Sequence, residues 1–126
     1  MDKEKTFFLK KAHLLRKNKE FQFVYRCGKS VANRFAVLYV MKNSSVDRRA
    51  GFVTGKRLGG AVVRNRVKRL FKEAYRLNQS KLKHGFDLIV IGRGPVVGQG
   101  QATVTKAFLD LCKRAKILLD EERRQS

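Results

Sequence analysis

The stretch KRLGGAVVRNRVKRLFKEAYR (Lys56–Arg76) decides the fold, because it predicts one long amphipathic helix. The turn signal Gly59–Gly60 precedes this helix, which we expect over Ala61–Leu77. At about 100° per residue, one stripe of the helix is apolar and predicts a buried face: Val63, Val67, Leu70, Ala74 and Leu77. The opposite side is polar and basic: Arg64, Asn65, Lys68, Arg69, Lys72 and Arg76.

The basic side of this helix repels itself. Arg64, Lys68 and Lys72 stand four residues apart, where like charges cost about 0.2–0.5 kcal/mol per pair. From Lys56 to Lys72 there are seven Lys or Arg residues and no acid. A solvated charged face is the alternative interpretation, but such faces usually mix signs, and here no acid appears before Glu73. The pattern favours a polyanionic partner, since Arg and Lys bind phosphate well.

The composition agrees with such a partner. The 126 residues are 43% hydrophobic, enough for one folded domain, and carry a formal net charge of +20. Nucleic acid fits this charge better than a membrane, because the longest apolar run, Phe35–Met41, has only the length of a strand. No secretory signal is visible. Cys27 and Cys112 lack metal or redox spacing and predict reduced core thiols, so we expect a cytoplasmic protein.

Elements on both sides of the long helix predict an α+β fold. Asn18 is the expected cap of a helix over Lys19–Cys27. Strands are predicted over Arg34–Lys42, over Ala50–Thr54 as its antiparallel return, and over His84–Gly92 with both faces covered. An apolar stripe predicts a C-terminal helix: Val104, Phe108, Leu111, Cys112, Ala115 and Leu118. We expect a single-domain α-β sandwich over residues 1–126 with a small, mostly antiparallel sheet; residues 1–12 and about 120–126 are predicted to be flexible.

The sequence offers little for catalysis by side chains. His13 and His84 are the only imidazoles, and neither lies near a Cys, Ser or acid at a recognisable spacing. A Cys–His pair formed in space stays open as an alternative, but phosphate loops, zinc ligand sets and nucleophile elbows are not visible. We therefore predict no catalytic residue and no metal ligand.

Aromatic residues form a second group of candidates. Phe21 and Tyr25 are four residues apart and share a helix face, among basic residues such as Lys17 and Arg26. Stacking rings beside a basic track are typical of proteins that hold single-stranded RNA. The alternative is that these rings belong to the core.

The pattern G-x-A-V-x-R-N-R-x-K-R, here Gly59–Arg69, resembles the signature of the bacterial ribonuclease P protein component. The resemblance extends to NKEFQFVYRCGKSVANRFAVLY (Asn18–Tyr39) and FDLIVIGRGP (Phe86–Pro95), and it spans about residues 14–119. Gly60 departs from the family, which very often has Asn there.

The resemblance implies the subunit of a ribonucleoprotein that removes the 5′ leader of precursor tRNA, with the RNA subunit as the catalyst. It implies a ribosomal-protein-like fold with a left-handed βαβ crossover. Mg²⁺ would be bound mainly through the RNA, and the partners would be the catalytic RNA and precursor tRNA, without a membrane or an obligate protein partner. The implied RNA-binding residues are Lys56, Arg57, Arg64, Asn65, Arg66, Lys68, Arg69 and Lys72, and the implied leader cleft contains Phe21, Tyr25 and Tyr39. A ribosomal or other structural RNA-binding protein of similar fold is the alternative.

Overall fold

The computed structural model of the chain describes residues 14–44 and 47–119, so the predicted flexible ends lie outside the described residues. The chain forms three α-helices, four strands and three short 3₁₀ turns within that part. In chain order they are α2 (Asn18–Cys27), β1 (Lys29–Ala32), β2 (Ala36–Lys42), β3 (Arg49–Val53), η2 (Lys56–Leu58), α3 (Ala61–Asn78), η3 (Gln79–Lys81), β4 (Phe86–Gly92), η4 (Gly94–Val96) and α4 (Gln101–Arg114).

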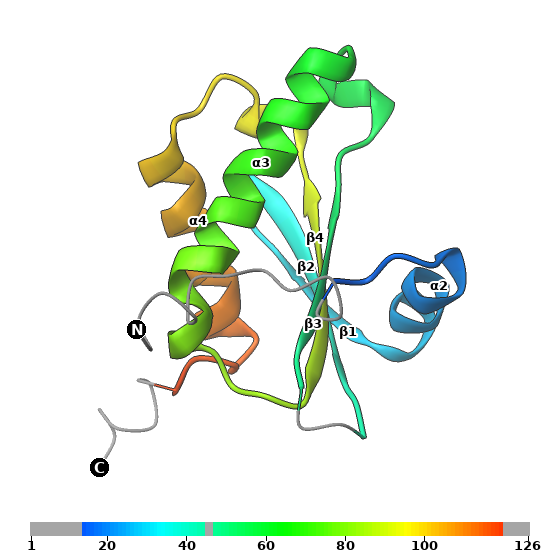
Figure 1. Cartoon of the computed structure of the whole chain (residues 1–126). Helices are drawn as coiled ribbons and strands as arrows, with labels where there is room; N and C mark the ends of the chain where they lie inside the picture. The colour runs from blue at the N-terminus through cyan, green and yellow to red at the C-terminus, as the bar shows by residue number, and fades with distance from the viewer. Residues whose placement is uncertain (1–13, 45–46, 120–126) are drawn as a thin grey trace, which may run out of the picture.

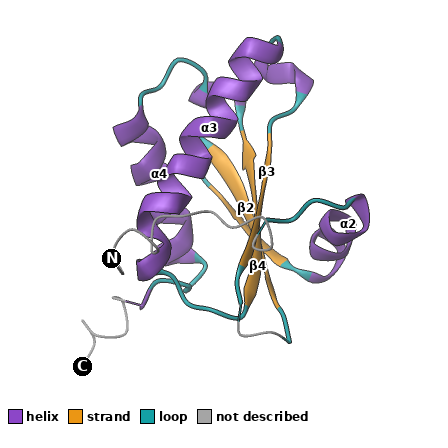
Figure 2. Ribbon diagram, viewed as in Figure 1, coloured by secondary structure: helices purple, strands orange, loops and turns teal. Residues whose placement is uncertain are grey.

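The strands make one sheet in the order β1-β2-β4-β3, sandwiched between helices. Figure 1 shows α3 and α4 on one face of this sheet and α2 on the other, and Figure 2 shows the same layers by element type. β4 lies inside the sheet, and its residues from Asp87 to Val90 are buried, as the unbroken apolar run predicts. Two of the three strand pairs are antiparallel, so the predicted α-β sandwich with a mostly antiparallel sheet is confirmed.

The predicted pairing of β3 was wrong. β3 is not the antiparallel return of β2, because β4 lies between them and β3 pairs with β4 in parallel, from Arg49↔Asp87 to Val53↔Ile91. Two parallel neighbours need a crossover connection, and α3 supplies it, as the family resemblance implies. The edge strand β1 was not predicted, since its four residues KSVA are mostly exposed and carry no apolar alternation.

The buried stripe of α3 is rotated relative to the predicted one. Its buried residues are Val67, Phe71, Ala74, Tyr75 and Asn78. Leu77, expected in the core, is 41% exposed. The Tyr75 ring fixes this orientation of α3. It packs edge-on against Phe52 of β3 and Phe108 of α4, at 5.8 and 6.3 Å between ring centroids.

The two cysteines differ. Cys112 is buried with Val104, Phe108 and Leu111 on α4, as predicted, and its burial raises the pKa of its thiol far above the ordinary value. Cys27 is exposed at the end of α2, so its assignment to the core was wrong. Both are free thiols.

Candidate nucleic-acid interface

The start of α3 is built from a turn that requires glycine at one position. Gly59 has a φ of 138°, a conformation that side chains rarely adopt, whereas Gly60 has an ordinary φ of −71°. No acid lies in the first turn of α3 and no side chain caps it, so its first N–H groups meet no competing carboxylate. Lys56 and Arg57 are exposed in η2 just before this turn.

The predicted RNA-binding residues of α3 divide into three groups. Arg64, Lys68 and Lys72 are half-buried. Asn65 and Arg69 are exposed on the outward side. On the flank toward α4, Arg66 donates a hydrogen bond from Nη2 to the carbonyl oxygen of Gln99 at 3.1 Å. We call Arg64, Lys68 and Lys72 the basic row. The basic row borders the buried stripe of α3, whereas the sequence predicted it on the opposite side of the helix.

Arg64 has an unusual polar environment. Its Nε is buried, yet it has no hydrogen-bond partner among the described residues. Buried donors are nearly always paired in native proteins, because an unpaired one costs about 1–3 kcal/mol. Arg64 thus carries a donor that the described residues leave unsatisfied, and an acceptor from outside the chain could reach it only after the side chain turned outward.

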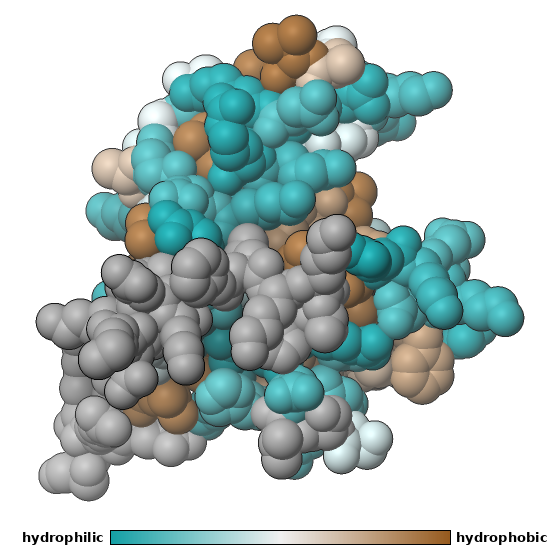
Figure 3. Space-filling view, in the orientation of Figure 1, coloured by the Kyte–Doolittle hydropathy of each residue, from teal (hydrophilic) through white to brown (hydrophobic). Residues whose placement is uncertain are grey.

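The rings predicted for the leader cleft lie together. Phe21 and Tyr25 of α2 are 6.5 Å apart between centroids, and Tyr25 meets Tyr39 of β2 edge-on at 5.0 Å. All three are half-buried on the α2 side of the sheet. Burial, and secondarily the Tyr39 hydroxyl, raise the pKa of Tyr25. On this same side, Figure 3 shows the surface hollowed between α2 and the top of the molecule, where α3 starts, with hydrophobic atoms in the hollow.

Phe21 is also a packing residue. A Cβ on Gly51 of β3 would lie 2.5 Å from the Phe21 ring, so the ring rests directly on bare backbone. Both interpretations of Phe21 that the sequence left open therefore have a structural basis.

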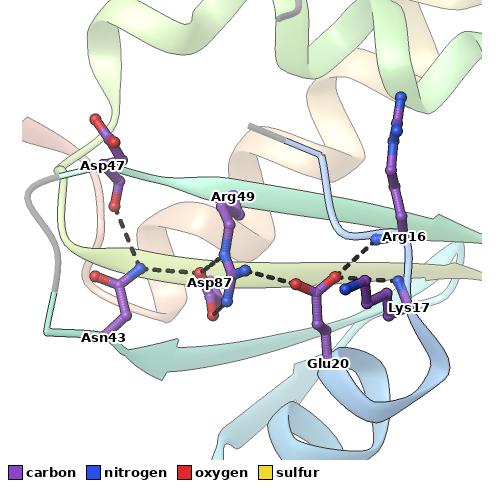
Figure 4. Close-up of polar contacts among 7 residues, drawn as sticks. All are labelled: Arg16, Lys17, Glu20, Asn43, Asp47, Arg49 and Asp87. Atoms are coloured by element: carbon purple, nitrogen blue, oxygen red, sulfur yellow. Dashed lines mark hydrogen bonds and ion pairs between the residues drawn. The ribbon is translucent and has the colours of Figure 1, made fainter. Parts of the chain in front are cut away.

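An ion-pair network fixes α2 over the sheet (Figure 4). Arg49 of β3 donates from Nε and Nη2 to the carboxylate of Asp87, at 3.1 and 2.8 Å, and from Nη1 to Glu20 of α2 at 2.7 Å. The other oxygen of Glu20 accepts the backbone N–H groups of Arg16 and Lys17 at 3.0 and 3.1 Å. These backbone hydrogen bonds, and then Arg49, lower the pKa of Glu20.

Sequence reasoning missed this network. Lys17, not Asn18, is the N-cap position of α2, so the predicted cap was wrong, and Glu20 supplies the capping carboxylate. One signal was available in the sequence. Asp87 is an acid inside an apolar run, and a carboxylate that is only 1% exposed needs a cationic partner. Its partner Arg49 is 38 residues away, which no local spacing reveals.

None of the helices in the described part of the chain is both long and apolar enough to cross a bilayer. No group of three or more His, Cys, Asp and Glu side chains in residues 14–44 and 47–119 could hold a metal ion.

The chain is similar to known proteins over nearly its whole length. The family model for ribonuclease P matches residues 9–116. A ribonuclease P protein component from Clostridium botulinum (strain Loch Maree / Type A3) is 46% identical over 108 residues, which are 85% of this chain and 97% of the relative. One from Clostridium acetobutylicum is 42% identical over 115 residues, covering 90% of this chain and 97% of the relative.

Solved structures agree with these relatives. The RNase P protein of Staphylococcus aureus superimposes with a TM-score of 0.79 at 35% identity, covering 85% of this chain and 98% of that one. The RNase P protein of Thermotoga maritima gives 0.74 at 33% identity, covering 79% and 94%. The signature at the start of α3, the sandwich around it and these matches lead to one conclusion: the chain belongs to the ribonuclease P protein family, as a protein component that works with an RNA component.

Proposed function

We propose that this subunit binds the catalytic RNA of ribonuclease P through α3 and holds the single-stranded 5′ leader of precursor tRNA beside α2. The observation that carries the proposal is the basic row on α3, with the unpaired Nε of Arg64, together with a half-buried group of three rings on the α2 face of the sheet. Ribosomal or other structural RNA binding is not favoured, because the relatives are ribonuclease P proteins.

The basic row would contact phosphates of the catalytic RNA. Phosphate oxygens would relieve the repulsion between Arg64, Lys68 and Lys72 and accept from the Arg64 guanidinium. Lys56 and Arg57, exposed just before α3, would extend the same contact together with Asn65 and Arg69. Because Arg66 is engaged with Gln99, its part in RNA binding would be smaller.

Catalysis would reside in the RNA. The described residues offer no donor set for Mg²⁺, so the ion would be held mainly by RNA phosphates, and the isolated protein is expected to cleave nothing. We place this activity in the cytoplasm, whose reducing conditions suit the exposed free thiol of Cys27.

The leader would lie against the rings of the cleft. Tyr25 and Tyr39 offer ring surface to unpaired bases, and such stacking is largely independent of base identity. One subunit could therefore serve leaders of many sequences.

The affinities of the holoenzyme for precursor and for mature tRNA show whether these rings bind the leader or only pack in the core. With the holoenzyme, Tyr39→Ala should weaken precursor tRNA binding by about 5- to 150-fold, the range of one stacked base, and hardly change the binding of mature tRNA. Tyr39→Phe, which keeps the ring, is the matched control and should bind like wild type. Phe21 is less suitable, because truncating a packed Phe costs about 3–5 kcal/mol of stability.

Equal losses for both tRNAs, or a collapsed denaturant melt of Tyr39→Ala, would contradict the leader assignment. The RNA partner is tested separately by isolating the tagged chain from cells and sequencing the bound RNA. A single catalytic RNA is expected, and ribosomal RNA alone would overturn the proposal.

A further inference from the structure

A groove separate from the proposed leader cleft lies at the other end of the sheet from the start of α3; we call it the second groove. Its volume is about 820 Å³, and it runs from the end of α2, past β1 and the end of β2, to the last turn of α4. The lining residues that matter here are Phe23, Lys29, Lys42, Phe86, Arg114 and Lys116. No Asp or Glu lines it.

The walls of this groove combine one accessible ring with unpaired cations. Phe23 is 49% exposed, the only aromatic residue among the large hydrophobic side chains that are exposed in the described part of the chain. No acid of the described residues pairs with Lys29, Lys42 or Lys116. Arg114 is engaged, since it donates to the carbonyl oxygen of Ala32 at 2.8 Å and lies 3.6 Å from the carboxylate of Asp110. A ring for a base and amines for its phosphates are what single-stranded RNA requires.

Lys116 occupies a position where glycine is usual. It follows the end of α4 with a φ of 63°, and it is the only residue other than glycine with a positive φ in the described part of the chain. Its N–H bonds the carbonyl of Lys113, and the N–H of Ile117 bonds that of Cys112, the pattern of a helix end that favours glycine. A lysine there is unfavourable for the backbone, and it places a cation at the groove.

The pairing of β2 with β4 orders the three sites along the length of the sheet, although Tyr39 faces the α2 side, whereas Gly92 and Phe86 face the side of α3 and α4. At one end, Gly92 of β4 lies against Val67 and Leu58, next to the start of α3. In the middle, Tyr39 pairs with Ile89, where the rings of the proposed cleft lie. At the other end Lys42 pairs with Phe86, and both line the groove. Seven residues of strand separate the two ends by about 20 Å.

We propose that this groove binds the upstream part of the single-stranded leader, beyond the nucleotides held in the ring cleft. The proposal rests on the proposed function, because it needs the leader to run from α3 past Tyr39. A leader that continues from Tyr39 along β2, past Met41 on the same face, reaches Phe23 and Lys116 only if it is long enough. The groove therefore makes affinity depend on leader length.

The test measures holoenzyme affinity for one tRNA with no leader, with a leader of about 4 nucleotides and with one of about 16, the range of single-strand site sizes. Lys116→Gly should weaken binding of the long-leader substrate about 2- to 10-fold and Phe23→Ala about 5-fold or more, without effect on the short leader. Lys106→Ala is the control, because it removes one exposed charge from α4 outside the groove.

Loss of stability should not account for the weaker binding of Lys116→Gly. Lys116→Gly removes the strained side chain, so its denaturant midpoint should equal or exceed that of wild type. It should also reduce the slope of log affinity against log salt by about 0.7 for the long leader only. The native thiol gives a second measurement: a photo-cross-linker on Cys27, the exposed cysteine, should attach to the upstream part of the long leader.

Four outcomes overturn the groove. Equal losses for all three tRNAs would mean that the groove contacts the catalytic RNA, and no loss for the long leader would mean that it contacts no RNA. Cross-links from Cys27 to the catalytic RNA alone would also reject it. If the wild-type holoenzyme binds the short-leader tRNA no more tightly than the tRNA without a leader, the proposed leader cleft itself fails. If it binds the short-leader tRNA more tightly, but the long leader adds no further affinity, only the groove fails.

Discussion

Arg64 is the side chain that most directly links the fold to a partner. Its stem borders the buried stripe of α3, and its Nε has no partner among the described residues. A buried donor without a partner is unfavourable in the free protein. We therefore expect Arg64 to contribute more to binding than to folding.

Arg64→Ala should weaken binding to the catalytic RNA by about 10- to 150-fold, the value of a hydrogen bond to a charged group. Stability should be unchanged or slightly higher, because the substitution removes both the unpaired donor and one like charge. Arg76→Ala is the control on the same helix, since Arg76 is already paired with Glu73 at 2.7 Å. Filter binding and thermal melts measure both effects. A strongly lowered melting temperature would make Arg64 a structural residue instead.

Glu20 predicts a dependence of stability on pH. Its pKa is lowered in the folded chain by the N–H groups of Arg16 and Lys17 and by Arg49. A lowered carboxyl pKa stabilises the fold above the ordinary value of 4.5, and this contribution is lost as the pH falls through the folded pKa. Glu20→Gln should be less stable than wild type near neutral pH, and the difference should shrink below pH 4.5 in urea melts. A difference that stays constant from neutral pH to well below 4.5 would contradict this account.

The docking of α2 depends on charge as well as on apolar packing. Val24 is the only buried residue within the helix, while Phe21 and Tyr25 are half-buried. Arg49 joins the first turn of α2 to the buried Asp87 and so ties the helix to two strands. The position of α2 sets where its rings lie, and the network is therefore part of the proposed leader cleft.

Arg49→Ala should lower the free energy of unfolding by about 1–3 kcal/mol, because it leaves Asp87 buried with Asn43 as its remaining side-chain partner. Amide hydrogens of α2 should exchange faster, while those of α3 should keep their protection. Arg26→Ala, an exposed cation on α2, is the control and should change neither measurement. Uniform loss of protection across the sheet would show that Arg49 supports the entire core and not the docking of one helix.

The net charge of +20 governs the encounter with RNA. Basic residues lie on α3, on η2 and around the second groove, so the attraction is spread over several surfaces. Much of the binding free energy should then come from counterion release, which weakens as salt rises.

If about seven phosphates are contacted, the slope of log affinity against log salt should be about −5, from about 0.7 per phosphate. Titrations of the catalytic RNA at several salt concentrations measure this slope. Affinity that hardly changes with salt would reject the polyanion interpretation for the chain as a whole.

Local patterns in the sequence were sufficient for the elements with a strong period. Apolar spacing predicted α3 and α4, apolar runs predicted β2 and β4, and the signature around Arg64 indicated the family. These features depend on residues a few positions apart, and the sequence alone determined them.

Only the tertiary structure decided how the elements meet. β3 pairs with β4 because the crossover through α3 returns the chain beside it, and no local period carries that choice. Arg48, just before β3, is buried and donates to Tyr75 and to the carbonyl oxygens of Gln79, Leu82 and Lys83. The buried stripe of α3 includes Phe71 and Tyr75. It is rotated from the predicted stripe because the Tyr75 ring packs against Phe52 of β3 and Phe108 of α4. The reason is the same in each case: hydrogen-bond partners and packing volumes are supplied by residues far away in the chain, whereas periodicity records only which face of an element avoids water.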